Sequence, residues 1–152
     1  MNRIVGFYDR GVTIAASRLS EGLALFLLRV ALAGVFWRSG QTKVVEGSFL
    51  RIDPSQYDLF RSEFSGLPLD PVIAVPLTTF AEHFFPLLLF FGLATRFSAG
   101  ALLVMTLVIQ IFVFPDAWWP VHSLWTAMAA ILIVRGGGLF SLDALIARVR
   151  AK

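Results

Sequence analysis

The side chains best able to do chemistry lie within apolar stretches of the chain. Glu82 and His83 are adjacent in one such stretch, and His122 lies in another. A carboxylate beside a histidine, faced by an arginine such as Arg38, could relay protons or hold a quinone carbonyl. The same groups could instead fasten helices together, because a polar group in hydrocarbon needs an internal partner. The sequence alone favours neither role.

Other chemistries are weaker fits to these residues. Two histidines at similar depth would suit axial ligation of haem, but both have polar neighbours that could satisfy them, so we expect no haem. We also expect no metal site built from His83 and His122 with Glu82 or Asp116. The chain has no cysteine, which excludes disulfides, thiol relays, iron–sulfur clusters and thiolate-bound metals.

The composition indicates what surrounds these groups. Hydrophobic residues make up 57% of the 152 residues and charged residues 15%, with a mean hydropathy of +0.77. Soluble proteins contain about 45–50% apolar and about 25% charged residues. The net charge of +3 comes from basic residues scattered between apolar stretches, which argues against a nucleic-acid partner. The lipid bilayer is the expected environment.

Four stretches are long enough to cross a bilayer, whose core of about 30 Å needs roughly 20 helical residues. They cover residues 22–39, 71–94, 97–114 and 117–134. We therefore predict an all-α fold, an integral membrane four-helix bundle that forms one domain over residues 1–152. Residues 1–21 are expected to form a short interfacial helix, and Ser141 to begin a short C-terminal amphipathic helix. Residues 40–70 form the outer polar loop.

The distribution of basic residues predicts the orientation. Eight Lys or Arg residues lie on the side of the two termini, and only three lie on the other side: Lys43, Arg51 and Arg61. Because basic loops stay in the cytoplasm, we expect both termini to be cytoplasmic and the membrane to be a bacterial inner membrane.

The helical rise of about 1.5 Å per residue places the polar side chains in depth. One shell near the outer surface is expected to contain Arg38, Glu82, His83, Gln110 and His122, with Gln41, Lys43 and Asp116 just above it. We predict that these residues form a polar cluster inside the bundle, built around a salt bridge between Arg38 and Glu82. Arg29 is expected either to snorkel to the inner headgroups or to pair within the bundle near Arg96.

Three tryptophans, Trp118, Trp119 and Trp125, lie in or near the start of the fourth stretch. They could stack on a flat cofactor. Aromatic residues at this position are usually interface anchors, and we assign them that role.

The order of several short motifs resembles the DoxX family of small bacterial membrane proteins. The matching segments are residues 28–29, 36–43 (FWRSGQTK), 81–86 (AEHFFP), 92–96 (GLATR), 114–118 (FPDAW), His122 and residues 141–143 (SLD). The resemblance implies a four-helix inner-membrane protein, and some relatives act with quinone-linked sulfur oxidation or with complexes that handle oxidative stress. It points to Arg38, Gln41, Lys43, Glu82, His83, Arg96, Asp116 and His122.

Three functions are compatible with these features. The first is an accessory subunit that docks a redox or stress-response protein partner through the polar cluster and the loop 40–70, which holds three basic and five acidic residues. The second is a quinone-binding subunit of a membrane oxidoreductase. A small-solute carrier ranks last, because no second half mirrors the break that Pro86 could introduce. No catalytic motif is present, and the sequence leaves open whether the protein forms an oligomer.

Overall fold

A computed structural model describes residue 6 and residues 12–151 of the chain. In this part of the chain the structure is helical, with α2 (Arg18–Gln41), α3 (Ser55–Ser62), α4 (Pro71–Phe91), α5 (Thr95–Phe112), α6 (Ser123–Arg135) and α7 (Leu142–Arg150). A 3-10 turn, η1 (Pro115–Ala117), and a π-helical turn, η2 (Trp118–His122), precede α6. Four of the described helical segments are long and apolar enough to span a membrane: α2, α4, α5 and the segment Pro115–Arg135. The predicted all-α membrane bundle is confirmed.

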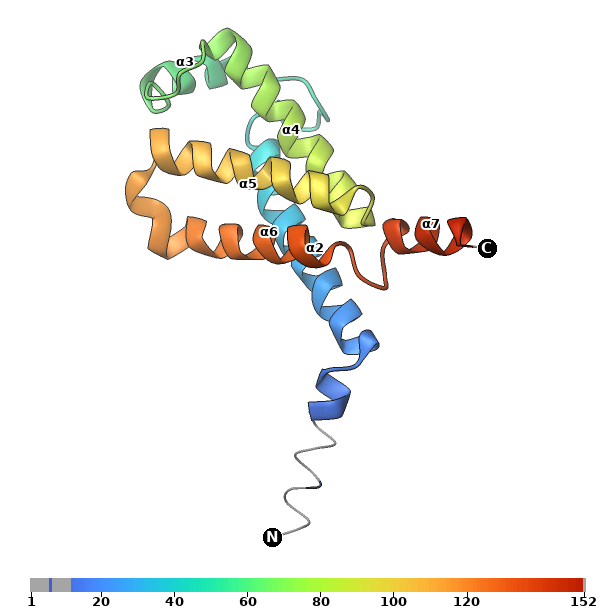
Figure 1. The fold of residues 1–152 in the computed structure, drawn as a ribbon. Helices are drawn as coiled ribbons and strands as arrows, with labels where there is room; N and C mark the ends of the chain where they lie inside the picture. Colours follow the sequence, from blue (N-terminus) through green and yellow to red (C-terminus); the bar gives the residue numbers. More distant parts are fainter. Residues whose placement is uncertain (1–5, 7–11, 152) are drawn as a thin grey trace.

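The four long segments pack as two pairs. Helix α2 packs chiefly against α4, and α5 against the antiparallel α6, with α2 crossing behind the α5–α6 pair in Figure 1. The shared core includes Leu32, Phe36, Leu89, Leu102 and Leu132. Large apolar side chains also point outward, and each of the following is at least 61% exposed: Leu27, Val72, Phe97, Val104 and Ile111. Such an apolar exterior is typical of helices that face lipid.

The helices begin and end at residues that suit those positions. The Ser17 hydroxyl accepts a hydrogen bond from the Ser20 N–H at 3.2 Å, and the Asp70 carboxylate accepts one from the Val72 N–H at 2.8 Å. Pro71 occupies the first turn of α4, where its missing N–H costs nothing. Helix α4 is capped by Gly92, whose φ of 67° lies in the left-handed region that favours glycine.

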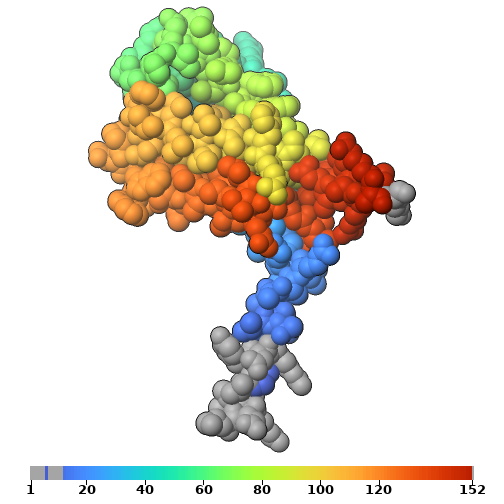
Figure 2. Space-filling model, viewed as in Figure 1, coloured from blue at the N-terminus to red at the C-terminus, as the bar shows by residue number. Residues whose placement is uncertain are grey.

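A short helix was predicted at each end of the chain, and the structure describes the C-terminal one more fully than the N-terminal one. Most of the predicted N-terminal interfacial helix lies outside the described residues, although residues 12–15 are helical. The C-terminal amphipathic helix is present as α7, which begins after Ser141 as expected. The Ser141 Oγ accepts a hydrogen bond from the Ala144 N–H at 3.1 Å. The space-filling view in Figure 2 shows α7 at one edge of the molecule, while the beginning of α2 extends beyond the body.

The segment 40–70 is a folded cap as well as a polar loop. Val44 and Ile52 form an isolated antiparallel bridge, and Phe60 of α3 is buried against Ala74 and Val75 of α4. The Asp53 carboxylate accepts hydrogen bonds from the Ser55 hydroxyl at 2.7 Å and the Ser55 N–H at 2.9 Å, and these bonds lower the pKa of Asp53. This segment therefore lies at a defined position over one end of the bundle.

Candidate functional site

The centre of the candidate site is an ion pair between α4 and the residues that follow α2. The Lys43 Nζ lies 2.7 Å from the Glu82 Oε2, and both side chains are buried. The Ser39 hydroxyl donates to the Glu82 Oε1 at 3.0 Å and accepts from the Lys43 Nζ at 3.3 Å. The three groups thus form a closed ring of polar contacts. Such compensation is what a charge inside a membrane protein requires.

The predicted salt bridge between Arg38 and Glu82 is wrong. Arg38 is exposed, and Lys43 is the basic residue at the carboxylate. Successive helical residues are rotated by about 100° around the axis, so Ser39 and Gly40 face α4 while Arg38 does not. Depth along the helix was the basis of the prediction, and depth does not determine the face on which a side chain lies.

His83 is satisfied separately, by groups on α2 and α4. Its Nδ1 lies 2.7 Å from the Thr79 carbonyl oxygen, and its Nε2 lies 2.9 Å from the Gln41 Nε2. Because a carbonyl can only accept, Nδ1 donates to Thr79, and Nε2 forms a hydrogen bond with the Gln41 amide. The close approach depends on Gly40, where an added Cβ would lie 2.8 Å from the His83 Cε1. His83 is therefore held between α2 and α4.

His122 belongs to a second polar group, formed by α5 and the π-helical turn η2. Its Nδ1 donates to the Gln110 Oε1 at 2.7 Å, and the Gln110 Nε2 donates to the Pro115 carbonyl oxygen at 2.6 Å. No described residue forms a hydrogen bond with the His122 Nε2 in the structure. The wide turn of η2 places this ring, and π-helical turns often occur at functional sites.

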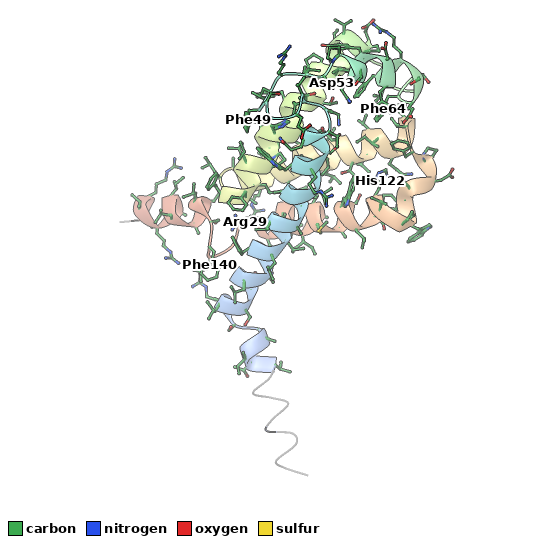
Figure 3. The ribbon with its side chains drawn as sticks, turned by 180° about the vertical axis from the view of Figure 1, so that it is seen from behind. Arg29, Phe49, Asp53, Phe64, His122 and Phe140 are labelled. Carbon is green, nitrogen blue, oxygen red and sulfur yellow. The ribbon has the colours of Figure 1, made fainter. Side chains whose placement is uncertain are left out.

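The ion pair and His122 line one cavity, which we call the cap cavity. It has a volume of about 310 Å³ and lies between the cap and helices α2, α4, α5 and α6. Its walls are mainly apolar and include five aromatic residues, Phe36, Phe60, Phe64, Phe114 and Trp125, whereas the polar side chains are Ser39, Lys43, Thr78, Glu82 and His122. In Figure 3, His122 lies between α5 and α6 on the side of the molecule where Phe64 sits in the cap.

The structure brings together only part of the predicted cluster. Lys43, Glu82 and His122 line the cap cavity, while Gln41 and His83 pair outside it and Gln110 supports His122. Arg38 and Asp116 are exposed and are not among the residues that line it.

Some cavity residues were not predicted. Ser39 was not recognised, and neither were Phe60 of α3 and Phe64 just after it, although their spacing of four residues is a helical signal that could have been used. Trp125 was predicted to be an interface anchor, but it lines the cavity and its ring centroid lies 5.1 Å from that of His122. That role for Trp125 is wrong, because its ring packs against the core of the bundle and lines the cavity.

Arg29 lies near the opposite end of the bundle and is fully buried, so the predicted snorkelling is wrong. Its Nη1 donates to the carbonyl oxygens of Leu89 (3.1 Å) and Phe90 (2.8 Å), and its Nη2 donates to the Phe140 carbonyl oxygen at 2.5 Å. Leu89 and Phe90 lie in the last turn of α4, whose carbonyls carry the negative end of the helix dipole, which makes them good acceptors for a guanidinium. The alternative prediction, pairing within the bundle, is confirmed, and the partners are backbone carbonyls of α4 and of Phe140.

Comparisons with known proteins agree with the resemblance in the sequence. The family model for DoxX matches residues 24–115. An uncharacterized protein of Haemophilus influenzae is 32% identical over 147 residues, covering 86% of this chain and 88% of the relative. No solved structure matches the chain.

Proposed function

The chain belongs to the DoxX family, and from the cap cavity we propose that it is an accessory subunit of a membrane redox complex that binds a lipid-soluble quinone. The observation that carries this proposal is an apolar, aromatic-walled cavity with a few polar groups inside a membrane bundle. Small-molecule sites typically have volumes of about 300–1,000 Å³ and this mixture of apolar walls and few polar groups. The cavity volume of about 310 Å³ lies at the lower end of that range.

The polar side chains offer complementary contacts for a quinone head group. The Lys43 ammonium has three N–H donors, of which two face Glu82 and Ser39, so one remains for a quinone carbonyl, and the His122 Nε2 can accept a hydrogen bond from a quinol hydroxyl. The ring of Trp125 and those of Phe60 and Phe64 supply flat apolar surfaces. A bound quinone would supply two-electron, two-proton redox chemistry. The residues of this chain would orient it and exchange protons at His122 and Glu82.

The accessory role is supported by the absence of a catalytic motif and of cysteine from the sequence. We infer that electrons pass to a redox or stress-response partner docked on the cap, residues 40–70, whose three basic and five acidic residues offer a polar contact surface. We place the protein in a bacterial inner membrane with both termini in the cytoplasm, because eight basic residues lie on that side and three on the other. In this orientation the cap cavity lies toward the outer side of the membrane. No observation favours the small-solute carrier.

The test is quinone retention by protein purified in a mild detergent. Organic extracts are analysed by mass spectrometry, and short-chain ubiquinone and menaquinone analogues are titrated into the purified protein. We expect wild type to bind one of these, and His122→Phe to bind it about tenfold more weakly, because one hydrogen bond to the ligand is lost. Arg38→Gln is the matched control, since Arg38 is exposed and does not line the cavity.

Two results would contradict the proposal. Wild type that binds neither analogue, and carries no quinone after purification, would exclude a quinone site. Equal binding by wild type and His122→Phe would show that the ligand lies elsewhere. Ala81→Leu would fill part of the cavity and should also weaken quinone binding. This variant tests the site without changing His122.

A further inference from the structure

A second, larger cavity lies at the other end of the bundle, and we call it the tail cavity. It has a volume of about 840 Å³ and is bordered by the beginnings of α2 and α5, the end of α6, and α7. Its charged lining residues are Arg18, Glu21, Arg96, Arg135, Asp143 and Arg148. Four guanidinium groups and two carboxylates therefore face one space.

The two carboxylates are already engaged by the protein. Glu21 accepts a hydrogen bond from the Arg135 Nε at 2.8 Å, in an ion pair at the surface. The oxygens of Asp143 accept from the Ala94 N–H at 2.8 Å and the Thr95 N–H at 2.9 Å, which caps the beginning of α5. Neither carboxylate forms a salt bridge with the remaining arginines of the cavity.

The remaining arginines leave a surplus of positive charge. The Arg96 Nη1 donates to the Ile133 carbonyl oxygen at 2.6 Å, and this bond leaves its charge without a carboxylate partner. The side chains of Arg18 and Arg148 form no hydrogen bond or ion pair with any described residue, and both are exposed. Several guanidinium groups around one space favour a phosphate, because each offers a planar set of N–H donors.

Apolar groups beside the cavity indicate an amphipathic ligand. Phe97 lines the cavity and is 67% exposed. On α7, Leu145 and Val149 are exposed apolar neighbours of Arg148, so this helix combines an apolar face with basic residues. A free phosphate compound would make no use of these side chains, whereas the acyl chains of a lipid would cover them.

We propose that the tail cavity binds an anionic phospholipid, with the phosphate among Arg18, Arg96 and Arg148 and the acyl chains along Phe97 and α7. Basic pockets between membrane helices are suited to such headgroups. This site is separate from the cap cavity and does not depend on quinone binding.

Native mass spectrometry of the full chain in mild detergent tests the proposal. The protein is titrated in parallel with phosphatidylglycerol, phosphatidylcholine and inorganic phosphate. We expect preferential retention of phosphatidylglycerol. Arg18→Gln and Arg148→Gln should each weaken it about fivefold, which corresponds to about 1 kcal/mol for each basic side chain near an anionic lipid. Arg150→Gln is the matched control, because Arg150 lies on α7 but not in the cavity lining.

Three results would overturn the proposal. Wild type that retains phosphatidylcholine as well as phosphatidylglycerol would show no headgroup site. If Arg148→Gln and Arg150→Gln lost the same amount of phosphatidylglycerol, the retention would depend only on the overall charge of α7 and not on the cavity. Inorganic phosphate that binds without any lipid preference would identify the ligand as a soluble phosphate compound. Because both arginines are exposed, their replacement should leave the melting temperature unchanged, which separates lipid loss from unfolding.

Discussion

Lys43 and Glu82 form a buried ion pair, with Nζ 2.7 Å from Oε2, at the point where the residues after α2 meet α4. The pair joins the end of the first long helix to the middle of the second, and it forms part of the cap cavity. Removing either partner would leave the other charge buried without compensation, which should lower the free energy of unfolding.

Lys43→Ala should destabilise the protein by about 3 kcal/mol or more, because the Glu82 carboxylate would remain buried and unpaired. Unfolding in a detergent titration measures the change. The double variant Lys43→Met with Glu82→Met should recover much of the stability, since both charges are removed together. Arg38→Ala, at an exposed position, should cost less than about 0.5 kcal/mol. Equal losses for Lys43→Ala and Arg38→Ala would argue against the pair.

Gly40→Ala should destabilise the packing of α2 on α4 by about 1–3 kcal/mol. The new methyl group would lie 2.8 Å from the His83 Cε1 and 3.2 Å from the Glu82 Cβ, so the two helices must move apart. Gly34→Ala on the same helix is the control, since nothing lies within 4 Å of its added Cβ. That change should be neutral or should stabilise by up to about 1 kcal/mol, because alanine favours helix. The melting temperatures of the two variants should therefore shift in opposite directions, or only that of Gly40→Ala should fall.

Arg29→Met should lower the free energy of unfolding by about 2–3 kcal/mol, because the carbonyls of Leu89, Phe90 and Phe140 would lose their charged donor. Arg29→Lys keeps the charge but offers fewer donors, and an intermediate stability is expected. The measurement is again unfolding in detergent. A stability of Arg29→Met equal to that of wild type would mean that these contacts contribute nothing.

Asp143→Ala should cost about 1 kcal/mol by removing the cap of α5. It should also release the tail, which limited proteolysis would detect as faster cleavage after Arg135. Asp58→Ala is the control, since Asp58 forms an exposed pair with Arg61 and should change stability by less than about 0.5 kcal/mol. Unchanged proteolysis of Asp143→Ala would contradict a role of this residue in holding the tail.

The architecture was predictable because hydrophobic length is a strong signal for membrane helices. The depth argument also placed Lys43, Glu82 and His122 near one end of the bundle, where all three line the cap cavity. It could not choose Lys43 over Arg38 as the partner of Glu82, because that choice depends on rotation around the helix axis and on how the chain turns after Gln41.

Long-range contacts account for the other differences. Helix α5 begins at Thr95, two residues before the predicted span, and its cap is Asp143, which lies 48 residues further along the chain. Arg29 likewise has acceptors from α4 and from the tail, so no local pattern indicates its burial. The π-helical turn at residues 118–122, which contains His122, is a further conformation that a regular helical pattern does not reveal.

The hydrogen bond from Arg29 to the Phe140 carbonyl has a consequence for biogenesis, since 111 residues separate the two. When the ribosome has delivered the first span to the membrane, the chain segment that completes the coordination of this guanidinium has not yet been synthesised. The hydrogen bonds of Arg29 therefore stay incomplete until residue 140 has been synthesised, long after the first helix has entered the membrane.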